Sequence, residues 1–208
     1  MILENTRGEH ATQQALVSEA SRFFECLYPS GIPNGMKLLI WQRQIRYSSW
    51  FADLTSASEF AIEASRITDV YVGAGLRVEG LSGRRTGGNG DVVAIPAFWA
   101  DLDAGDKSNG KNYPPTIEDI YEVLNDLPHA PTVMLKSGSG IHAWWKFDRL
   151  WLFNSQEDRK DAQQQLRSWS RMLQFSARKW GWQFDSSSAL TKLMRIPGTL
   201  NHGACPDH

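Results

Sequence analysis

The stretch IPAFWADLD (residues 95–103) is an apolar run that ends in two acids. An apolar, aromatic lead-in of this length is typical of a buried strand. Side chains alternate between the two faces of a strand, so Asp101 and Asp103 should project to the same side. Two neighbouring carboxylates repel unless a cation lies between them, and hard oxygen ligands suit Mg²⁺ or Mn²⁺. The stretch therefore predicts a strand that delivers two acids to a metal site, with a solvated turn as the alternative.

A second polar element, SGSGIH (residues 137–142), lies between the predicted strands 132–137 and 141–147. Glycines let backbone N–H groups approach an anion closely, and serine hydroxyls add donors. The imidazole on the returning strand can donate to a phosphate oxygen, and a lysine precedes the turn. The element predicts a hairpin that binds a phosphate; an ordinary turn followed by a core histidine is the alternative. The candidate residues are Lys136, Ser137, Ser139, Gly140 and His142.

A third element joins Asp185 to the turn RIPGTLNH (residues 195–202). Asp185 could complete a three-carboxylate metal site, and Arg195 could clamp a triphosphate. The alternative makes Asp185 the N-cap of a short helix. Asp148 competes for the third position, but it lies six residues beyond His142, about 20 Å along an extended strand. Asp185 also follows a predicted strand, 182–184, so it is the preferred third acid.

The other predicted elements alternate without a regular βαβ rhythm, which favours an α+β fold. Predicted helices span 11–27, 56–67, 116–127 and about 155–180, with a short one after Asp185, and further predicted strands span 36–42, 44–51 and 69–78. A capping box formed by Thr116 and Asp119 marks the start of the third helix.

Composition excludes several classes of protein. The 208 residues include two cysteines, too few for a disulfide framework. No apolar run approaches the roughly 20 residues needed to span a bilayer, and the first residues lack the shape of a signal peptide. The formal net charge of −1 gives no global basic field, so binding of nucleic acid would need local patches. Nine tryptophans could fill a core or stack on bases.

Two local basic patches are candidates for DNA contact. On a helical wheel, four cations of the last predicted helix fall within about 40° of one another, opposite Leu166, Trp169, Leu173 and Trp180. A glycine-rich loop at 79–91 carries two arginines. A solvated surface is the alternative for both. The candidate DNA-binding residues are Arg84, Arg85, Lys160, Arg167, Arg171 and Arg178.

The segments FWADLD (98–103), SGSGIHAWW (137–145) and RIPGTLNH (195–202) together resemble the archaeo-eukaryotic primase superfamily. The resemblance is to the primase–polymerase branch of phages, plasmids and related mobile elements. It implies a catalytic module at about 91–208 whose sheet is like that of an RNA-recognition motif, and an N-terminal α/β module at about 1–90.

The same resemblance implies template-directed nucleotidyl transfer by two metals, Mg²⁺ or Mn²⁺, held by Asp101, Asp103 and Asp185. Ser139 and His142 would bind the nucleoside triphosphate, with Lys136 and Arg195 as further phosphate contacts. Single-stranded or primed DNA would be the template. We expect a fragment of a longer replication protein, cytoplasmic in a bacterial or archaeal host, with a helicase domain or subunit downstream.

Two rival functions follow from the same residues. A non-catalytic replication-initiation module would keep the basic helix but would not need acids at the end of an apolar strand. A metal-dependent nuclease would use clustered acids but would not need a triphosphate cradle. His202, Cys205 and His208 could form a zinc site, with a disordered end as the alternative.

Overall fold

The structure, a computed structural model, describes residues 2–4, 12–83, 85–105, 110–186 and 188–202. Within these residues the chain has an α+β fold with four α-helices and a mostly antiparallel sheet. The helices are α1 (Gln13–Leu27), α2 (Leu54–Ala64), α3 (Ile117–Asn125) and α4 (Gln156–Arg178). The strands are β1 (Ile2–Glu4), β2 (Met36–Gln42), β3 (Tyr47–Phe51), β4 (Val70–Gly73), β5 (Leu76–Val78), β6 (Val92–Asp103), β7 (Val133–Lys136), β8 (Gly140–Leu152) and β9 (Leu193–Arg195).

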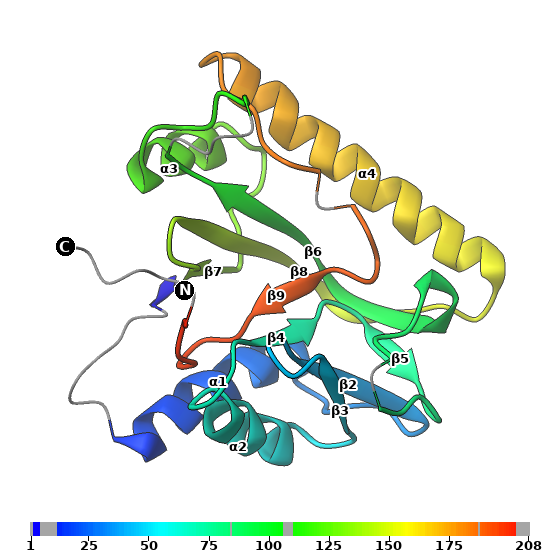
Figure 1. Cartoon of the computed structure of the whole chain (residues 1–208). Coiled ribbons are helices and arrows are strands. Elements are labelled where there is room, and N and C mark those ends of the chain that lie inside the picture. Colours follow the sequence, from blue (N-terminus) through cyan, green and yellow to red (C-terminus); the bar gives the residue numbers. More distant parts are fainter. Residues whose placement is uncertain (1, 5–11, 84, 106–109, 187, 203–208) are drawn as a thin grey trace.

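The sheet runs through both halves of the chain. Its order is β1-β7-β8-β6-β5-β2-β4-β9, with β3 paired to β2. Only the β1–β7 pair is parallel among the described pairings. The late strand β9 pairs with β4, so the end of the chain returns to the strands of its first half (Figure 1). This return brings residues near 195 close to those near 70.

Local sequence signals explain where the helices begin. Thr116 and Asp119 form the capping box that opens α3, as predicted, and Ser155 and Asp158 form another at α4. In each box the hydroxyl accepts from a backbone N–H of the first turn. The carboxylate of the acid accepts from the backbone N–H of the N-cap residue, so two otherwise unpaired donors are satisfied.

Helices cover both faces of the central strands. Phe23 of α1 packs edge-on against Trp144 of β8, with ring centroids 5.7 Å apart. On the other face, Leu173 of α4 and Ile120 of α3 join a second buried cluster that includes Trp145. In Figure 1, α1 and α2 lie below the sheet, while α3 and the long α4 lie above it. Since Trp144 and Trp145 are both buried, neither is available to stack on a base.

Three sequence expectations are corrected. The predicted strand 69–78 is broken into β4 and β5 by bends at residues 74 and 75. A side chain at Gly75 would place its Cβ 2.8 Å from the carbonyl oxygen of Ala94, so this bend has room only for glycine. Residues 182–184 are not a strand: Phe184 is buried, and the Gln183 N–H donates to Asn112 O at 2.8 Å instead of to a ladder. After Asp185 the described residues form turns and then β9 rather than a short helix.

The end of α4 also differs from expectation. Leu166 and Leu173 are buried as the helical wheel predicts, but Trp180 is 48% exposed.

Along the described residues, no helix combines the length and the apolarity that crossing a bilayer requires.

Candidate active site

The site begins where one face of the β6–β8 pair changes from apolar to polar. Trp99 of β6 lies opposite Trp144 of β8, and two residues further along Asp101 lies opposite His142. The tryptophans are buried in the core that α1 covers. Strand alternation therefore places Asp101 and His142 at the rim of that core, on the same face. His142 Nε2 lies 3.2 Å from Asp101 Oδ1.

A lysine that sequence reasoning missed completes this pair. Lys192, just before β9, places its Nζ 2.7 Å from Asp101 Oδ2. Burial would raise the pKa of Asp101, but the hydrogen bond from His142 and the charge of Lys192 outweigh burial and hold that pKa well below its usual range. Asp101 is thus an ionised carboxylate that already attracts a cation. A partly buried acid needs a counter-charge, and that need is the one sequence signal that could have pointed to a nearby lysine.

The proton on His142 can be assigned from its neighbours. The backbone N–H of Arg195 donates to His142 Nδ1 at 3.0 Å. Because Nδ1 accepts, the ring proton lies on Nε2, which faces Asp101. The imidazole, only 5% exposed, is therefore a fixed donor at Nε2. A ring held in this way is suited to donate to an oxygen and is not suited to act as a base.

The third predicted acid has partners of its own. Asp185 accepts from Lys111 Nζ and, at 3.1 Å, from the hydroxyl of Tyr113. The hydrogen bond from Lys111 lowers the pKa of Asp185, while burial and the negative charge of Asp101 oppose that change. The charge of Asp101 therefore reaches Asp185. Asp148, by contrast, is exposed in a part of β8 where the register with β6 shifts.

The predicted metal ligands do not form a ready-made cluster. Among the described residues, no three His, Cys, Asp or Glu side chains are grouped so that they could hold a metal ion. The donor set nevertheless fits a hard divalent cation, because Asp101 and Asp103 share a face of β6 and offer oxygens alone. Asp101 also binds the ammonium of Lys192, which shows that a cation is accommodated at this carboxylate.

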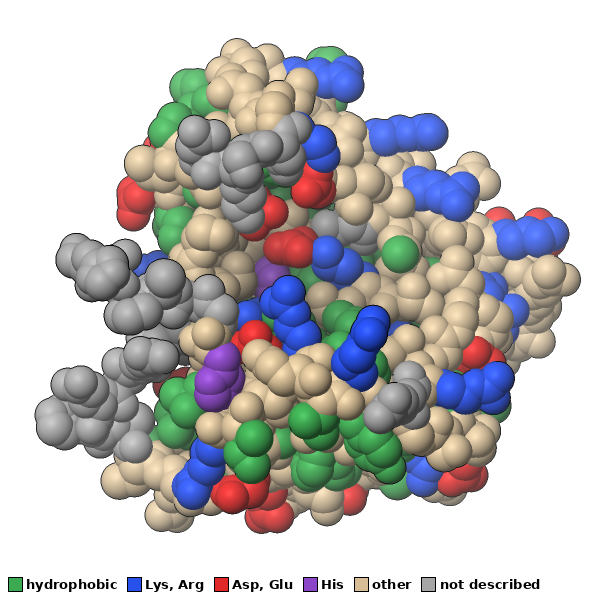
Figure 2. Space-filling view, in the orientation of Figure 1, with side chains coloured by type: hydrophobic (Ala, Val, Ile, Leu, Met, Phe, Trp, Pro, Cys, Tyr) green, Lys and Arg blue, Asp and Glu red, His purple; other side chains and the backbone are tan. Residues whose placement is uncertain are grey.

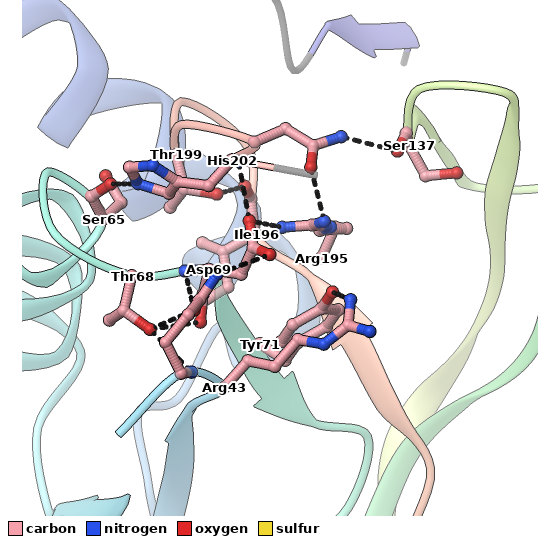
Figure 3. Close-up of polar contacts among 12 residues, drawn as sticks. Arg43, Ser65, Thr68, Asp69, Tyr71, Ser137, Arg195, Ile196, Thr199 and His202 are labelled. Atoms are coloured by element: carbon pink, nitrogen blue, oxygen red, sulfur yellow. Dashed lines mark hydrogen bonds and ion pairs between the residues drawn. The ribbon is translucent and has the colours of Figure 1, made fainter. Parts of the chain in front are cut away.

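The guanidinium of Arg195 contacts other side chains of the protein. Its Nη1 lies 3.0 Å from Asp69 Oδ1, its Nη2 donates to Asn201 Oδ1 at 2.6 Å, and its guanidinium lies 4.5 Å from the centre of the Tyr71 ring (Figure 3). Asn201 in turn donates to Ser137 O at 3.4 Å, in the turn between β7 and β8. Arg195 thus connects the β4 region to the Gly/Ser turn.

Asp69 is the centre of this network, and sequence reasoning missed it. Its buried carboxylate accepts from Arg195, from the His202 N–H at 2.8 Å and from Gln44 Nε2 at 3.1 Å. Burial would raise the pKa of Asp69, but these donors lower it below the ordinary value. Figure 3 shows Arg195 and His202, which belong to one segment, meeting at Asp69, which comes from another. The network fastens RIPGTLNH to the first half of the chain.

The Gly/Ser turn forms as predicted, with the Ser137 N–H donating to Gly140 O at 2.9 Å. Gly140 has a structural reason to be glycine, since a Cβ there would collide with the carbonyl oxygen of Leu102. Ser139 is exposed. Lys136 lies one residue out of phase with Leu135, which pairs with His142, so Lys136 faces the α3 side of the sheet. There, Lys136 and Ser139 line a groove of about 360 Å³ against the start of α3.

The predicted DNA-binding residues lie on the surface. Basic side chains follow α4 in Figure 2, which also shows this face hollowed at its centre, with acidic and basic side chains in the hollow. The exposed residues are Arg85, Lys160, Arg167, Arg171 and Arg178. Arg84 lies outside the described residues, as do Cys205 and His208 of the zinc alternative. His202 contacts Ser65 O through Nε2 at 2.7 Å.

Comparison with known proteins gives a match of fold. No family model and no curated protein matches the chain. One solved structure, the AEP domain of the primase-polymerase (PrimPol) of cyanophage S-2L, matches with a TM-score of 0.52 over 86% of this chain and 80% of that domain. Sequence identity is 12%, so the likeness concerns the fold. The α+β fold expected from the sequence is therefore confirmed: this chain has the fold of a primase-polymerase AEP domain.

Proposed function

We propose that this chain is a DNA-directed nucleotidyltransferase, a primase, a DNA polymerase or both. The observation that carries the proposal is the Asp101–His142 pair, joined by Lys192, at the end of the central strands of a primase-polymerase fold. An ionised acid, a fixed N–H donor and an ammonium meet there. Catalysis of phosphoryl transfer depends on charge stabilisation and positioning of this kind rather than on covalent chemistry by the protein.

Asp101, Asp103 and Asp185 would hold Mg²⁺ or Mn²⁺. The chemistry gained from such ions is activation of the primer 3′-hydroxyl and neutralisation of charge on the departing pyrophosphate. The protein contributes carboxylates kept ionised by their neighbours, since the pKa values of Asp101 and Asp185 are both lowered. Lys192 and Lys111 occupy two of these carboxylates and would have to give way.

The nucleoside triphosphate would bind beside these acids. His142 Nε2–H, which faces Asp101 Oδ1 in this structure, would donate to a phosphate oxygen once Asp101 engages a metal, and the Arg195 N–H at Nδ1 keeps the ring proton on Nε2. Lys192, once released from Asp101, is a nearby cation for the same phosphates. The remaining candidates for nucleotide binding are Ser137, Ser139, Gly140, the guanidinium of Arg195 and, on the α3 side of the sheet away from His142, Lys136. Of these, Arg195 would act through Asn201 on the turn, because its own donors are engaged.

DNA would lie along the basic face of α4, which offers Lys160, Arg167, Arg171 and Arg178. Arg84 and Arg85 are a second candidate contact. Contacts between these cations and DNA phosphates would bind any sequence and would weaken steeply with salt.

We further propose that the protein works in the cytoplasm of its host with a helicase domain or subunit.

Nucleotide incorporation on primed and unprimed templates, with Mg²⁺ and with Mn²⁺, tests the proposal. We expect metal-dependent extension by the wild type and none by Asp101→Asn or Asp103→Asn. Asp148→Asn is the matched control, since it removes an exposed acid from β8. Metal-dependent cleavage of the template without incorporation would replace the proposal by a nuclease. Template binding with neither reaction would favour the replication-initiation module.

A further inference from the structure

The end of α4 builds a tryptophan pair that the proposed chemistry does not use. Gly181, in the left-handed region with φ +78°, ends the helix. The Trp182 N–H donates to Ala177 O and the Gly181 N–H to Arg178 O, each at 3.0 Å, which is the Schellman pattern. The reversal brings Trp182 back against Trp180. Their rings stack with centroids 5.6 Å apart and planes inclined by 13°.

This pair is held rigidly on one side and open on the other. Trp182 packs against the buried cluster that contains Phe184 and Leu173. The backbone beside it is tied down, because Asn112 Nδ2 donates to Gly181 O at 2.9 Å and the Gln183 N–H donates to Asn112 O at 2.8 Å. Trp180 rests on this base and is 48% exposed. A large aromatic ring fixed in this way presents a flat apolar surface at little entropic cost.

The surroundings of the pair favour an anionic partner. Arg178 and Trp182 line one groove of about 200 Å³, together with Lys111. Among the described residues, no carboxylate pairs with Arg178, nor with Arg171 about two turns before it. Phe175, 67% exposed, lies between those two arginines in the sequence and within about 60° of each on the helical wheel. Aromatic rings therefore alternate with cations along this end of α4.

We propose that Trp180, stacked on Trp182, is a platform for an unpaired base of single-stranded nucleic acid. Stacking needs a free base face, which a strand offers when it is unpaired, whereas a continuous duplex hides those faces between its own base pairs. The cations beside the rings match the phosphates that follow each base. The strand's identity as the template rests on the proposed function, but binding of a single strand does not.

The platform is connected to the candidate active site. Lys111 lines the same groove as Trp182 and also binds Asp185. Asp185 lies three residues after Trp182 in the sequence, and the negative charge of Asp101 acts to raise its pKa. A strand with one base on Trp180 and its backbone along the groove would thus be led toward the acids. The arrangement gives the cationic face of α4 a defined end near the site of proposed chemistry.

Fluorescence anisotropy with labelled oligo-dT, and with an abasic oligomer of the same length, tests the platform without any catalysis. We expect Trp180→Ala to weaken oligo-dT binding roughly 10- to 100-fold, as for the loss of one stacked base. Binding of the abasic oligomer should not change, because it has phosphates but no bases. Trp180→Phe should retain most of the affinity. Tyr47→Ala is the matched control, since Tyr47 is similarly exposed, at 45%, on β3.

Salt dependence separates stacking from charge. Trp180→Ala should leave the log–log salt slope of oligo-dT binding unchanged, whereas Arg178→Gln should reduce its magnitude by about 0.7. Wild-type affinity in Trp180→Ala would overturn the platform and leave the pair as a surface for another protein. Equal loss on both oligomers would also overturn it. The oligomer assay needs neither nucleotide nor metal, so a failed platform and a failed enzymatic proposal give different results.

Discussion

His142 Nε2 and Asp101 Oδ1 face each other at 3.2 Å across the paired strands β8 and β6. The opposite nitrogen of His142 accepts the backbone N–H of Arg195, so three segments distant in sequence determine where one proton lies. The second oxygen of Asp101 binds Lys192. Substitutions at these positions therefore separate the contributions of acid, donor and cation.

Asp101→Asn should lower the free energy of unfolding by about 1–3 kcal/mol at pH 7, because hydrogen bonds to an ionised carboxylate are lost. The pKa of Asp101 is lowered in the folded protein, from about 3.9 in the unfolded chain. Its contribution is fully present above the unfolded pKa and is lost as pH falls through the folded pKa. Urea unfolding should thus show a constant difference from pH 7 to 5 that shrinks below about pH 4. A difference in stability that grows below about pH 4 would contradict an ionised Asp101 carboxylate in the folded protein.

His142→Ala should weaken nucleotide binding by about tenfold or more, because a donor to a charged phosphate is lost. Template affinity should be nearly unchanged, since His142 is buried beside Asp101 and away from the basic face of α4. Separate titrations of nucleotide and template measure the two effects. Unchanged nucleotide affinity with weakened template affinity would move His142 to the template.

Lys192→Ala should tighten Mn²⁺ binding several-fold in the absence of nucleotide, because an ammonium and a divalent cation compete for the Asp101 carboxylate. Titration calorimetry measures this without turnover. Lys192→Arg, which keeps the charge, serves as the control and should not show the gain. If Mn²⁺ binds more weakly to Lys192→Ala, Lys192 supports the metal site instead of competing with it.

Arg195→Ala should cost about 3–5 kcal/mol of stability, because it leaves the buried Asp69 carboxylate without its ionic partner. Arg195→Lys should also be destabilising, since one ammonium lacks the planar fork with which Arg195 contacts both Asp69 and Asn201. A double-mutant cycle, measured by urea unfolding of Asp69→Asn, Arg195→Gln and the variant with both changes, gives the coupling free energy between the two side chains. If the two single losses simply add, the two residues do not act as a pair.

Strand patterns predicted much of this site, because alternation is a local property. The lead-in to Asp101 predicted β6, and the Gly/Ser turn predicted the β7–β8 hairpin. The pairing of β9 with β4 could not be predicted, because a three-residue strand carries little periodicity and its partner lies over a hundred residues away. Lys192 and Asp69 were missed for the same reason: each acquires its role from residues that only the folded chain brings near.

The choice of third acid is the prediction with the sharpest test. Asp185 is held by Lys111 and Tyr113 and feels the charge of Asp101, whereas Asp148 is exposed where β8 slips its register on β6. A metal held jointly with Asp101 needs a carboxylate within electrostatic reach, which favours Asp185. We expect Asp185→Asn to lose incorporation and to bind Mn²⁺ at least tenfold more weakly, and Asp148→Asn to resemble the wild type in both. Activity kept in Asp185→Asn and lost in Asp148→Asn would reverse the assignment. Loss in neither would mean that Asp101 and Asp103 suffice.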